Sequence, residues 1–282
     1  MNSIITKDLN ISYGNIDIVK NLNLNIPKGK ITTIIGANGC GKSTILKTIG
    51  RIINPKSGSI YINGKNLHEE NPTDIAKEMA VLPQNPQAPS GLTVEELISY
   101  GRFPHQKGFG KMNKEDKDIV SWAMEVTKIS EFRDRNIDDL SGGQRQRAWI
   151  AMALAQETDI LLLDEPTTYL DLAHQLEILQ LLDELNKNEK RTIVMVIHEL
   201  NNASRFADHM IGIKKGKIVC EGEAHDVMTK ENLKEIFNID AEIVEDPRTK
   251  KPVCLTYDMV KKKLKNKGIK KEYLKEIRIN IN

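Results

Sequence analysis

The sequence lacks any apolar run of the roughly 18–20 residues that a helix needs to cross a bilayer. It also lacks a secretion signal, because Lys7 and Asp8 interrupt the only early apolar stretch. The 282-residue chain is therefore expected to stay in the cytoplasm, and it cannot form a membrane channel alone.

Cysteine is scarce, and neither sign of charge is in large excess. Cys40, Cys220 and Cys254 form no CxxC pair, so the sequence predicts free thiols rather than a disulfide framework or a zinc site. Lys and Arg number 41 against 39 Asp and Glu, which argues against a protein built to coat nucleic acid. The length allows one large domain or two small ones.

Short β-branched apolar runs alternate with helical stretches along the chain. Residues 4–26 predict antiparallel strands, and buried strands are predicted at residues 30–35, 160–163 and 192–197. A helix predicted at residues 173–188 lies between the last two strands, and this order implies a parallel sheet. Other helices are expected at residues 43–51, 93–101, 113–128 and 141–156. The predicted fold class is therefore α/β, with a helical insertion at about residues 86–156.

A phosphate-binding loop is predicted where the first buried strand meets a helix. Residues 36–43, Gly-Ala-Asn-Gly-Cys-Gly-Lys-Ser, match the pattern G-x-x-x-x-G-K-[ST]. Its glycines let backbone N–H groups converge on phosphate, and the helix N-terminus adds partial positive charge. Lys42 is expected to reach the β- and γ-phosphates, Ser43 to ligate Mg²⁺, and Thr44 to contact the α-phosphate. The predicted ATP-binding loop comprises Gly36, Asn38, Gly39, Cys40, Gly41, Lys42, Ser43 and Thr44.

Two acidic residues follow the strand at residues 160–163. Asp164 is expected to orient Mg²⁺, and Glu165 to polarise the attacking water as a general base. His198 ends the next buried strand, so it lies near Glu165 if the two strands are neighbours in the sheet. A purely structural histidine is the alternative, but the clustering favours a role in holding the water or the γ-phosphate.

The segment Leu140-Ser141-Gly142-Gly143-Gln144 resembles the signature motif of ABC ATPases. The resemblance extends from about residue 3 to residue 257. It implies a RecA-like P-loop NTPase core with an N-terminal antiparallel β subdomain and an inserted α-helical subdomain. In that family the signature motif binds the γ-phosphate held by the other subunit. The resemblance therefore implies a homodimer with two ATP molecules sandwiched head to tail.

Three further positions match motifs of that family. Tyr13 matches the aromatic residue that stacks on adenine, with a core aromatic as the alternative. Gln84 matches the Q-loop glutamine, which senses Mg²⁺ and links hydrolysis to the membrane partner. Asp171 matches the D-loop, which communicates across the dimer, although Tyr169 departs from the usual alanine there. The resemblance thus implies the catalytic residues Lys42, Gln84, Glu165 and His198, and the Mg²⁺ residues Ser43, Gln84 and Asp164.

Residues 99–106, 164–175 and 198–209 are similar to the ATPases of iron–siderophore importers. Haem and cobalamin importers share much of this pattern. The resemblance implies transport-coupled ATP hydrolysis by a peripheral subunit at the cytoplasmic face of the membrane. Permease subunits would dock near Gln84 and the helical insertion, and an extracytoplasmic solute-binding protein would take part indirectly.

Other functions stay open at this point. One is the ATPase of another importer or of an exporter. A soluble ABC protein acting on nucleic acid or ribosomes is disfavoured, because such proteins usually carry two ATPase units or a long coiled coil. A P-loop kinase would leave the segment at residues 140–144 unexplained.

A basic C-terminal tail at residues 258–282 follows the predicted ATPase domain at residues 1–257. Attraction to anionic lipid headgroups is one interpretation of the tail. A solvated, partly helical extension is the other.

Overall fold

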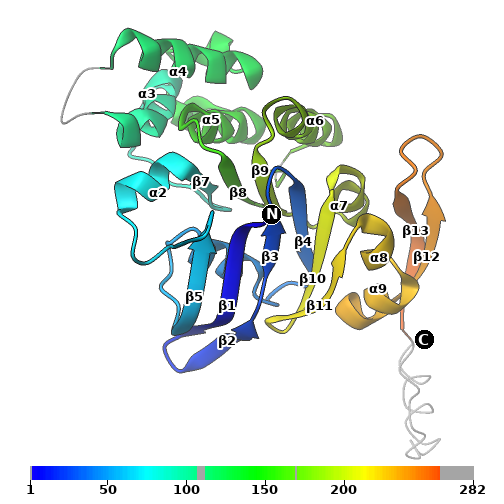
Figure 1. Cartoon of the computed structure of the whole chain (residues 1–282). Coiled ribbons are helices and arrows are strands. Elements are labelled where there is room, and N and C mark those ends of the chain that lie inside the picture. Colours follow the sequence, from blue (N-terminus) through cyan, green and yellow to red (C-terminus); the bar gives the residue numbers. More distant parts are fainter. Residues whose placement is uncertain (1, 107–111, 169, 261–282) are drawn as a thin grey trace, which may run out of the picture.

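The computed structural model describes residues 2–106, 112–168 and 170–260. A six-stranded sheet in the order β11-β10-β4-β9-β8-β7 forms its centre (Figure 1). Neighbouring strands are parallel except for the antiparallel pair β10–β11. The strands are β4 (Ile31–Gly36), β7 (Met79–Leu82), β8 (Ile160–Asp164), β9 (Thr192–Val196), β10 (His209–Lys214) and β11 (Lys217–Gly222). β8 and β9 are thus neighbours, as the placement of His198 beside Glu165 requires.

Both faces of the central sheet are covered, which explains why its strands are continuous apolar runs. Along β8, Leu161 and Leu163 join one apolar core, whereas Ile160 and Leu162 join the other. This alternation follows from the two-residue period of a strand. The first core lies under the helices of the insertion, and the second lies under α1 (Lys42–Ile49) and the N-terminal sheet.

The N-terminal strands form the predicted antiparallel sheet. Its strand order is β2-β1-β5-β6, with β3 also paired to β1. The strands are β1 (Asn2–Tyr13), β2 (Ile16–Leu22), β3 (Asn25–Pro27), β5 (Ser57–Ile62) and β6 (Lys65–Asn66). A turn after residue 13 places the end of β1 beside the start of β2, close to the phosphate loop.

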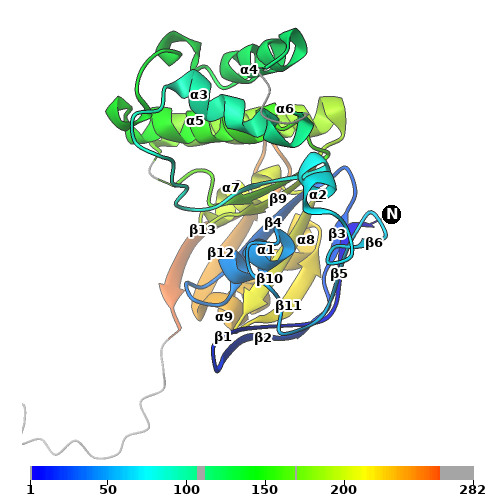
Figure 2. The same cartoon turned by 90° about the vertical axis from the view of Figure 1, so that its left-hand side faces the viewer.

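The expected helical insertion lies between β7 and β8 and forms a separate layer above the sheets (Figure 2). It contains α3 (Val94–Ser99), η1 (Tyr100–His105), α4 (Lys114–Val126), η2 (Ser130–Phe132), η3 (Ile137–Asp139) and α5 (Gly142–Ala155). Side chains cap α3, α4 and α5 at their N-termini, which fixes where each helix begins. The predicted α/β class with its two additional subdomains is confirmed.

The remaining helices connect or cover the central strands. They are α2 (Pro72–Glu78), α6 (Leu172–Glu189), α7 (Leu200–Phe206), α8 (Ala224–Val227) and α9 (Lys230–Phe237). None of the helices within the described ranges has the length and hydropathy of a membrane span. The cysteines Cys40, Cys220 and Cys254 are free, as predicted.

Several elements were not predicted from the sequence. β7 has four residues, too few for a strand period to be distinguished from a helical one. The last strands, β12 (Ile239–Glu245) and β13 (Pro252–Met259), form a hairpin in which Met259 pairs with Ile239. The hairpin therefore extends past residue 257, where the ATPase domain was expected to end. The rest of the predicted tail, residues 261–282, lies outside the described residues.

Candidate nucleotide site

The predicted phosphate loop joins the carboxyl end of β4 to the first turn of α1. A Cβ atom on Gly36 would lie 2.4 Å from the Ile213 carbonyl oxygen, so a larger residue cannot fit beside β10. Gly41, which precedes the helix, has a φ of +107°, a conformation that L side chains rarely adopt. Glycine at these two positions lets the chain turn tightly and expose its backbone N–H groups.

The loop is braced from two sides. Lys42 is 5% exposed, and its Nζ donates to the carbonyl oxygens of Gly36 at 2.8 Å and Ala37 at 3.2 Å. The Gly216 N–H, in the β10–β11 turn, donates to the Cys40 carbonyl at 2.7 Å. Burial raises the pKa of the Cys40 thiol, so this side chain supplies packing rather than reactivity.

Ser43 and Asp164 meet where α1 begins and β8 ends. The Ser43 hydroxyl donates to Asp164 Oδ1 at 2.8 Å, while Asp164 Oδ2 is buried without a hydrogen-bond partner in the described chain. Burial raises the pKa of this carboxyl. Oxygen donors of this kind suit Mg²⁺, which usually takes one or two protein ligands and completes its shell with water and phosphate oxygens. The orphaned oxygen and the adjacent hydroxyl therefore fit the predicted ion.

Glu165 is the centre of a second polar cluster. Its Oε1 lies 2.5 Å from His198 Nε2, and its Oε2 accepts from Gln84 Nε2 at 2.6 Å. The backbone of Glu165 has a φ of +56°, and its N–H donates to the Val196 carbonyl of β9 at 3.1 Å. The structure thus brings together three residues from three separate segments that the sequence analysis assigned to catalysis.

A cleft of about 410 Å³ joins the phosphate loop to this cluster. It is lined by Ile18, Asn38, Gly39, Gly41, Lys42, Ser43, Thr44, Gln84, Glu165 and His198. Ile18, on β2, was missed because an isolated strand isoleucine carries no signal in the sequence. Tyr13 lies at the end of β1 with 50% of its surface exposed, so it is not a core aromatic.

The signature segment lies on a different cleft, of about 460 Å³. Ser141 caps α5: the Gln144 N–H donates to its Oγ, and its own N–H donates to Gln144 Oε1 at 3.0 Å. Gly142 and Gly143 line the same cleft, as does Asp171. Asp171 caps α6, and the hydrogen bonds from His174, first that of its backbone N–H, lower the pKa of the Asp171 carboxyl. Within one described chain the two clefts share no lining residue.

Comparison with known proteins decides the family. The model of the ABC transporter family matches residues 19–168, which contain the phosphate loop, the signature segment and both acidic residues. The chain belongs to this family. It is an ABC ATPase, and such a domain binds ATP and hydrolyses it.

Curated relatives extend the likeness over nearly the whole ABC ATPase. The iron(3+)-hydroxamate import ATP-binding protein FhuC of Bacillus subtilis (strain 168) is 65% identical, over 93% of this chain and 97% of its own length. The ferric enterobactin transport ATP-binding protein FepC of Escherichia coli (strain K12) is 44% identical, over 88% of this chain and 92% of its own length.

A solved ABC cassette supports the same fold. The dimeric post-hydrolysis structure of MJ0796, bound to ADP and Pi, superposes with a TM-score of 0.69 at 31% sequence identity. The alignment covers 78% of this chain and 98% of the cassette.

Proposed function

We propose that this ABC ATPase powers the uptake of ferric siderophores through a separate membrane permease. The observation that carries the proposal is the 65% identity with an iron(3+)-hydroxamate import ATPase over 93% of the chain. A second relative, whose name assigns it to ferric enterobactin transport, supports the same class of cargo. Haem and cobalamin remain the competing cargoes, because importers of these chelates share much of the sequence pattern.

The residues of the first cleft divide the work of hydrolysis. Lys42 and the backbone N–H groups of the loop neutralise the β- and γ-phosphates, and Tyr13 stacks on the adenine. Ser43, Asp164 and Gln84 would hold Mg²⁺, and the ion would supply positive charge at the phosphates. Glu165 accepts a proton from the attacking water, and His198 holds the water or the γ-phosphate in place.

The second cleft gives a reason for two subunits. Within the described residues, the phosphate-loop cleft and the signature cleft are lined by different residues. In the proposed homodimer, the signature cleft of one subunit meets the ATP of its partner. Two-fold symmetry then makes the same contact a second time, because an isologous interface repeats each contact. Ser141, Gly142, Gly143 and Gln144 then bind the γ-phosphate across the interface, and Asp171 communicates between the two sites. The dimeric state of the MJ0796 cassette supports this assembly.

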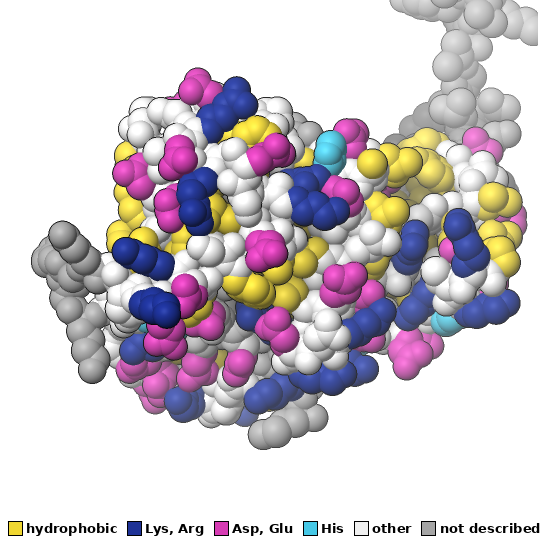
Figure 3. Space-filling view, turned by 90° about the horizontal axis from the view of Figure 1, so that it is seen from above, with side chains coloured by type: hydrophobic (Ala, Val, Ile, Leu, Met, Phe, Trp, Pro, Cys, Tyr) yellow, Lys and Arg dark blue, Asp and Glu magenta, His cyan; other side chains and the backbone are white. Residues whose placement is uncertain are grey.

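Gln84 provides a physical link between the permease and the reaction. Its amide occupies Glu165 Oε2 at 2.6 Å, so this oxygen is already engaged before a water arrives. A partner that displaces Gln84 would free one lone pair of this oxygen to accept a proton. We place the permease contact on the adjacent helical insertion, where Phe103 of η1 is 58% exposed and stacks on Tyr100 with centroids 4.8 Å apart. Acidic and basic side chains are interspersed over the top of this layer (Figure 3).

This assembly places the chain at the cytoplasmic face of the membrane as a peripheral subunit. An extracytoplasmic solute-binding protein delivers the cargo to the permease and does not touch the ATPase. No contact with nucleic acid is part of the proposal.

Labelled ferric-siderophore uptake tests the cargo. Cells whose own gene is replaced by the Lys42→Ala variant should lose uptake of a hydroxamate siderophore, while uptake of labelled cobalamin continues. Loss of cobalamin uptake with intact siderophore uptake would assign the chain to the competing cargo. The Glu165→Gln variant of the purified chain should bind ATP and dimerise without turning it over, whereas wild-type turnover would remove Glu165 from its role as base.

A further inference from the structure

Thr168 is the third donor to the Glu165 carboxylate, and none of the motifs discussed above accounts for it. Its hydroxyl donates to Glu165 Oε2 at 3.1 Å, and its backbone N–H donates to the Glu165 carbonyl at 3.2 Å. We infer that Thr168 is a positioning residue that aims Glu165 at the attacking water. The inference rests on the proposed role of Glu165 as general base.

The three donors differ in how firmly they are tied to Glu165. Gln84 follows β7, and His198 follows β9, so each reaches Glu165 from a different segment. Thr168 is three residues along the same turn, and its backbone bond to Glu165 fixes the distance between the two side chains. A change in the position of Gln84 therefore leaves the Thr168 hydroxyl bond in place.

The turn itself is anchored to the signature helix. The side chain of Gln146, on α5, donates to the Pro166 carbonyl at 2.9 Å, and the Leu170 N–H donates to the Thr167 carbonyl at 3.4 Å. Glu165 is only 8% exposed and has a positive φ, so its side chain has little freedom once these bonds are made.

A fixed carboxylate matters because a general base must lie within hydrogen-bond reach of the proton that it accepts. When Gln84 leaves, Oε2 has room for the water, and the hydroxyl of Thr168 still holds the carboxylate plane. Without that hydroxyl, the carboxylate retains His198 at Oε1 and can rotate about this contact. The chemical step should slow, while ATP binding, which depends on the phosphate loop, should not change.

The experiment compares Thr168→Val and Thr168→Ser in the purified full-length chain. Thr168→Val keeps the shape but removes the hydroxyl, and should lower kcat about tenfold, in line with the loss of a hydrogen bond to a charged group, with the KM for ATP changed less than about twofold. Thr168→Ser should keep kcat within about twofold of the wild type. Thr167→Val controls for disturbance of the turn, since the hydrogen bonds and the ion pair to the Glu165 carboxylate in the described chain come from Gln84, Thr168 and His198 and not from the Thr167 hydroxyl.

The single variant Glu165→Gln separates this inference from the function on which it rests, because it removes the base, whereas Thr168→Val removes only the group that positions the base. If Thr168→Val keeps the wild-type kcat while Glu165→Gln is inactive, the positioning role of Thr168 is overturned. The role of Glu165 as general base then still stands. Equal losses in Thr168→Val, Thr168→Ser and Thr167→Val, together with a lower melting temperature, would also overturn the positioning role. Turnover by Glu165→Gln at the wild-type rate would instead overturn the proposed function.

Discussion

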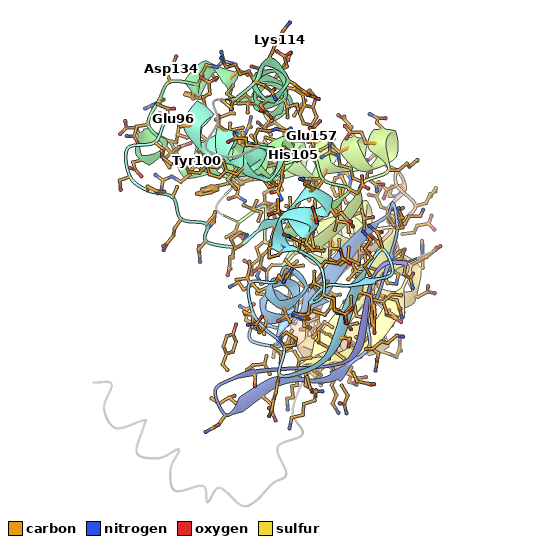
Figure 4. All side chains as sticks on the ribbon, turned by 60° about the vertical axis from the view of Figure 1, so that its left-hand side comes forward. Glu96, Tyr100, His105, Lys114, Asp134 and Glu157 are labelled. Carbon is orange, nitrogen blue, oxygen red and sulfur yellow. The ribbon has the colours of Figure 1, made fainter. Side chains whose placement is uncertain are left out.

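The buried Arg102 side chain joins three parts of the helical insertion, so its removal has a calculable cost. Arg102 lies on η1, and its side chain is 4% exposed. Its Nε donates to Asp116 Oδ1 of α4 at 2.9 Å, and its guanidinium also donates to the Ala155 carbonyl at the end of α5 at 2.8 Å. The guanidinium of Arg102 also donates to Glu157 Oε2 at 2.8 Å. Glu157 is labelled near His105 in Figure 4.

Replacing Arg102 by Met leaves the Asp116 carboxylate without its cationic partner, although Asp116 Oδ2 still accepts from the Asn113 N–H at 3.2 Å. The Asp116 side chain is only 6% exposed, and removing one member of a buried ion pair costs about 3–5 kcal/mol. The Glu157 side chain is 43% exposed, so its lost pair adds little. We therefore expect the free energy of unfolding to fall by about 3–5 kcal/mol, a large share of the ~5–15 kcal/mol that domains typically have.

Urea denaturation followed by circular dichroism measures this change. Pairing Arg102→Met with Asp116→Asn should recover part of the loss, because the uncompensated charge is then gone. Lys65→Ala is the matched control: it breaks an exposed ion pair with Glu78 and should barely move the midpoint. A loss below about 1 kcal/mol for Arg102→Met would show that water reaches Asp116 and that the cluster does not hold the insertion.

Three further predictions concern packing, thiol chemistry and acid stability. Gly101→Ala should lower stability by about 1–3 kcal/mol in a thermal melt, because the new Cβ would lie 2.3 Å from the Met152 carbonyl of α5; an unchanged melting temperature would refute this contact. Burial raises the pKa of Cys220 to about 11, so iodoacetamide at pH 8 should label it about a hundredfold more slowly in the native than in the denatured chain, as peptide mass analysis can check. Burial lowers the pKa of His209, so below its ordinary value near 6.5 the unfolded chain binds the proton more readily and stability falls as pH falls. His209→Asn should reduce the drop in melting temperature between pH 7.5 and 5.5, and an equal drop in both proteins would contradict the assignment.

The positions of the site residues along the sheet could be predicted because parallel strands share one carboxyl edge. β4, β8 and β9 are buried apolar runs, and polar residues follow each run directly. The place of β4 beside β9 was not predicted. The runs at residues 160–163 and 192–197 were predicted to share a parallel sheet, so Glu165 and His198 had to lie close together if those strands were neighbours. The structure confirms this proximity, with His198 Nε2 2.5 Å from Glu165 Oε1.

The contacts between side chains were not predictable from the same pattern. The hydrogen bond from the Gln84 amide to Glu165 was not predicted; it forms because β7 pairs with β8 and carries Gln84 to that edge, while the role of Gln84 at Mg²⁺ stays a prediction. The four residues of β7 gave no period from which to infer this pairing. Thr168 was missed for a related reason: its bond depends on the local turn after Glu165, where φ is +56° for a non-glycine residue.

The place of β4 in the sheet has a consequence for how the protein is made. β4 emerges early from the ribosome with the entire phosphate loop, yet its neighbours in the sheet are β9 and β10, which are encoded in the last third of the chain. The Gly216 turn that braces Cys40 is translated later still. A nascent chain halted at residue 168 would carry every residue predicted to contact phosphate in its own loop and have no neighbouring strand on either side of β4. Truncated products of translation are therefore expected to bind no nucleotide, and competence for ATP should appear abruptly as synthesis nears its end.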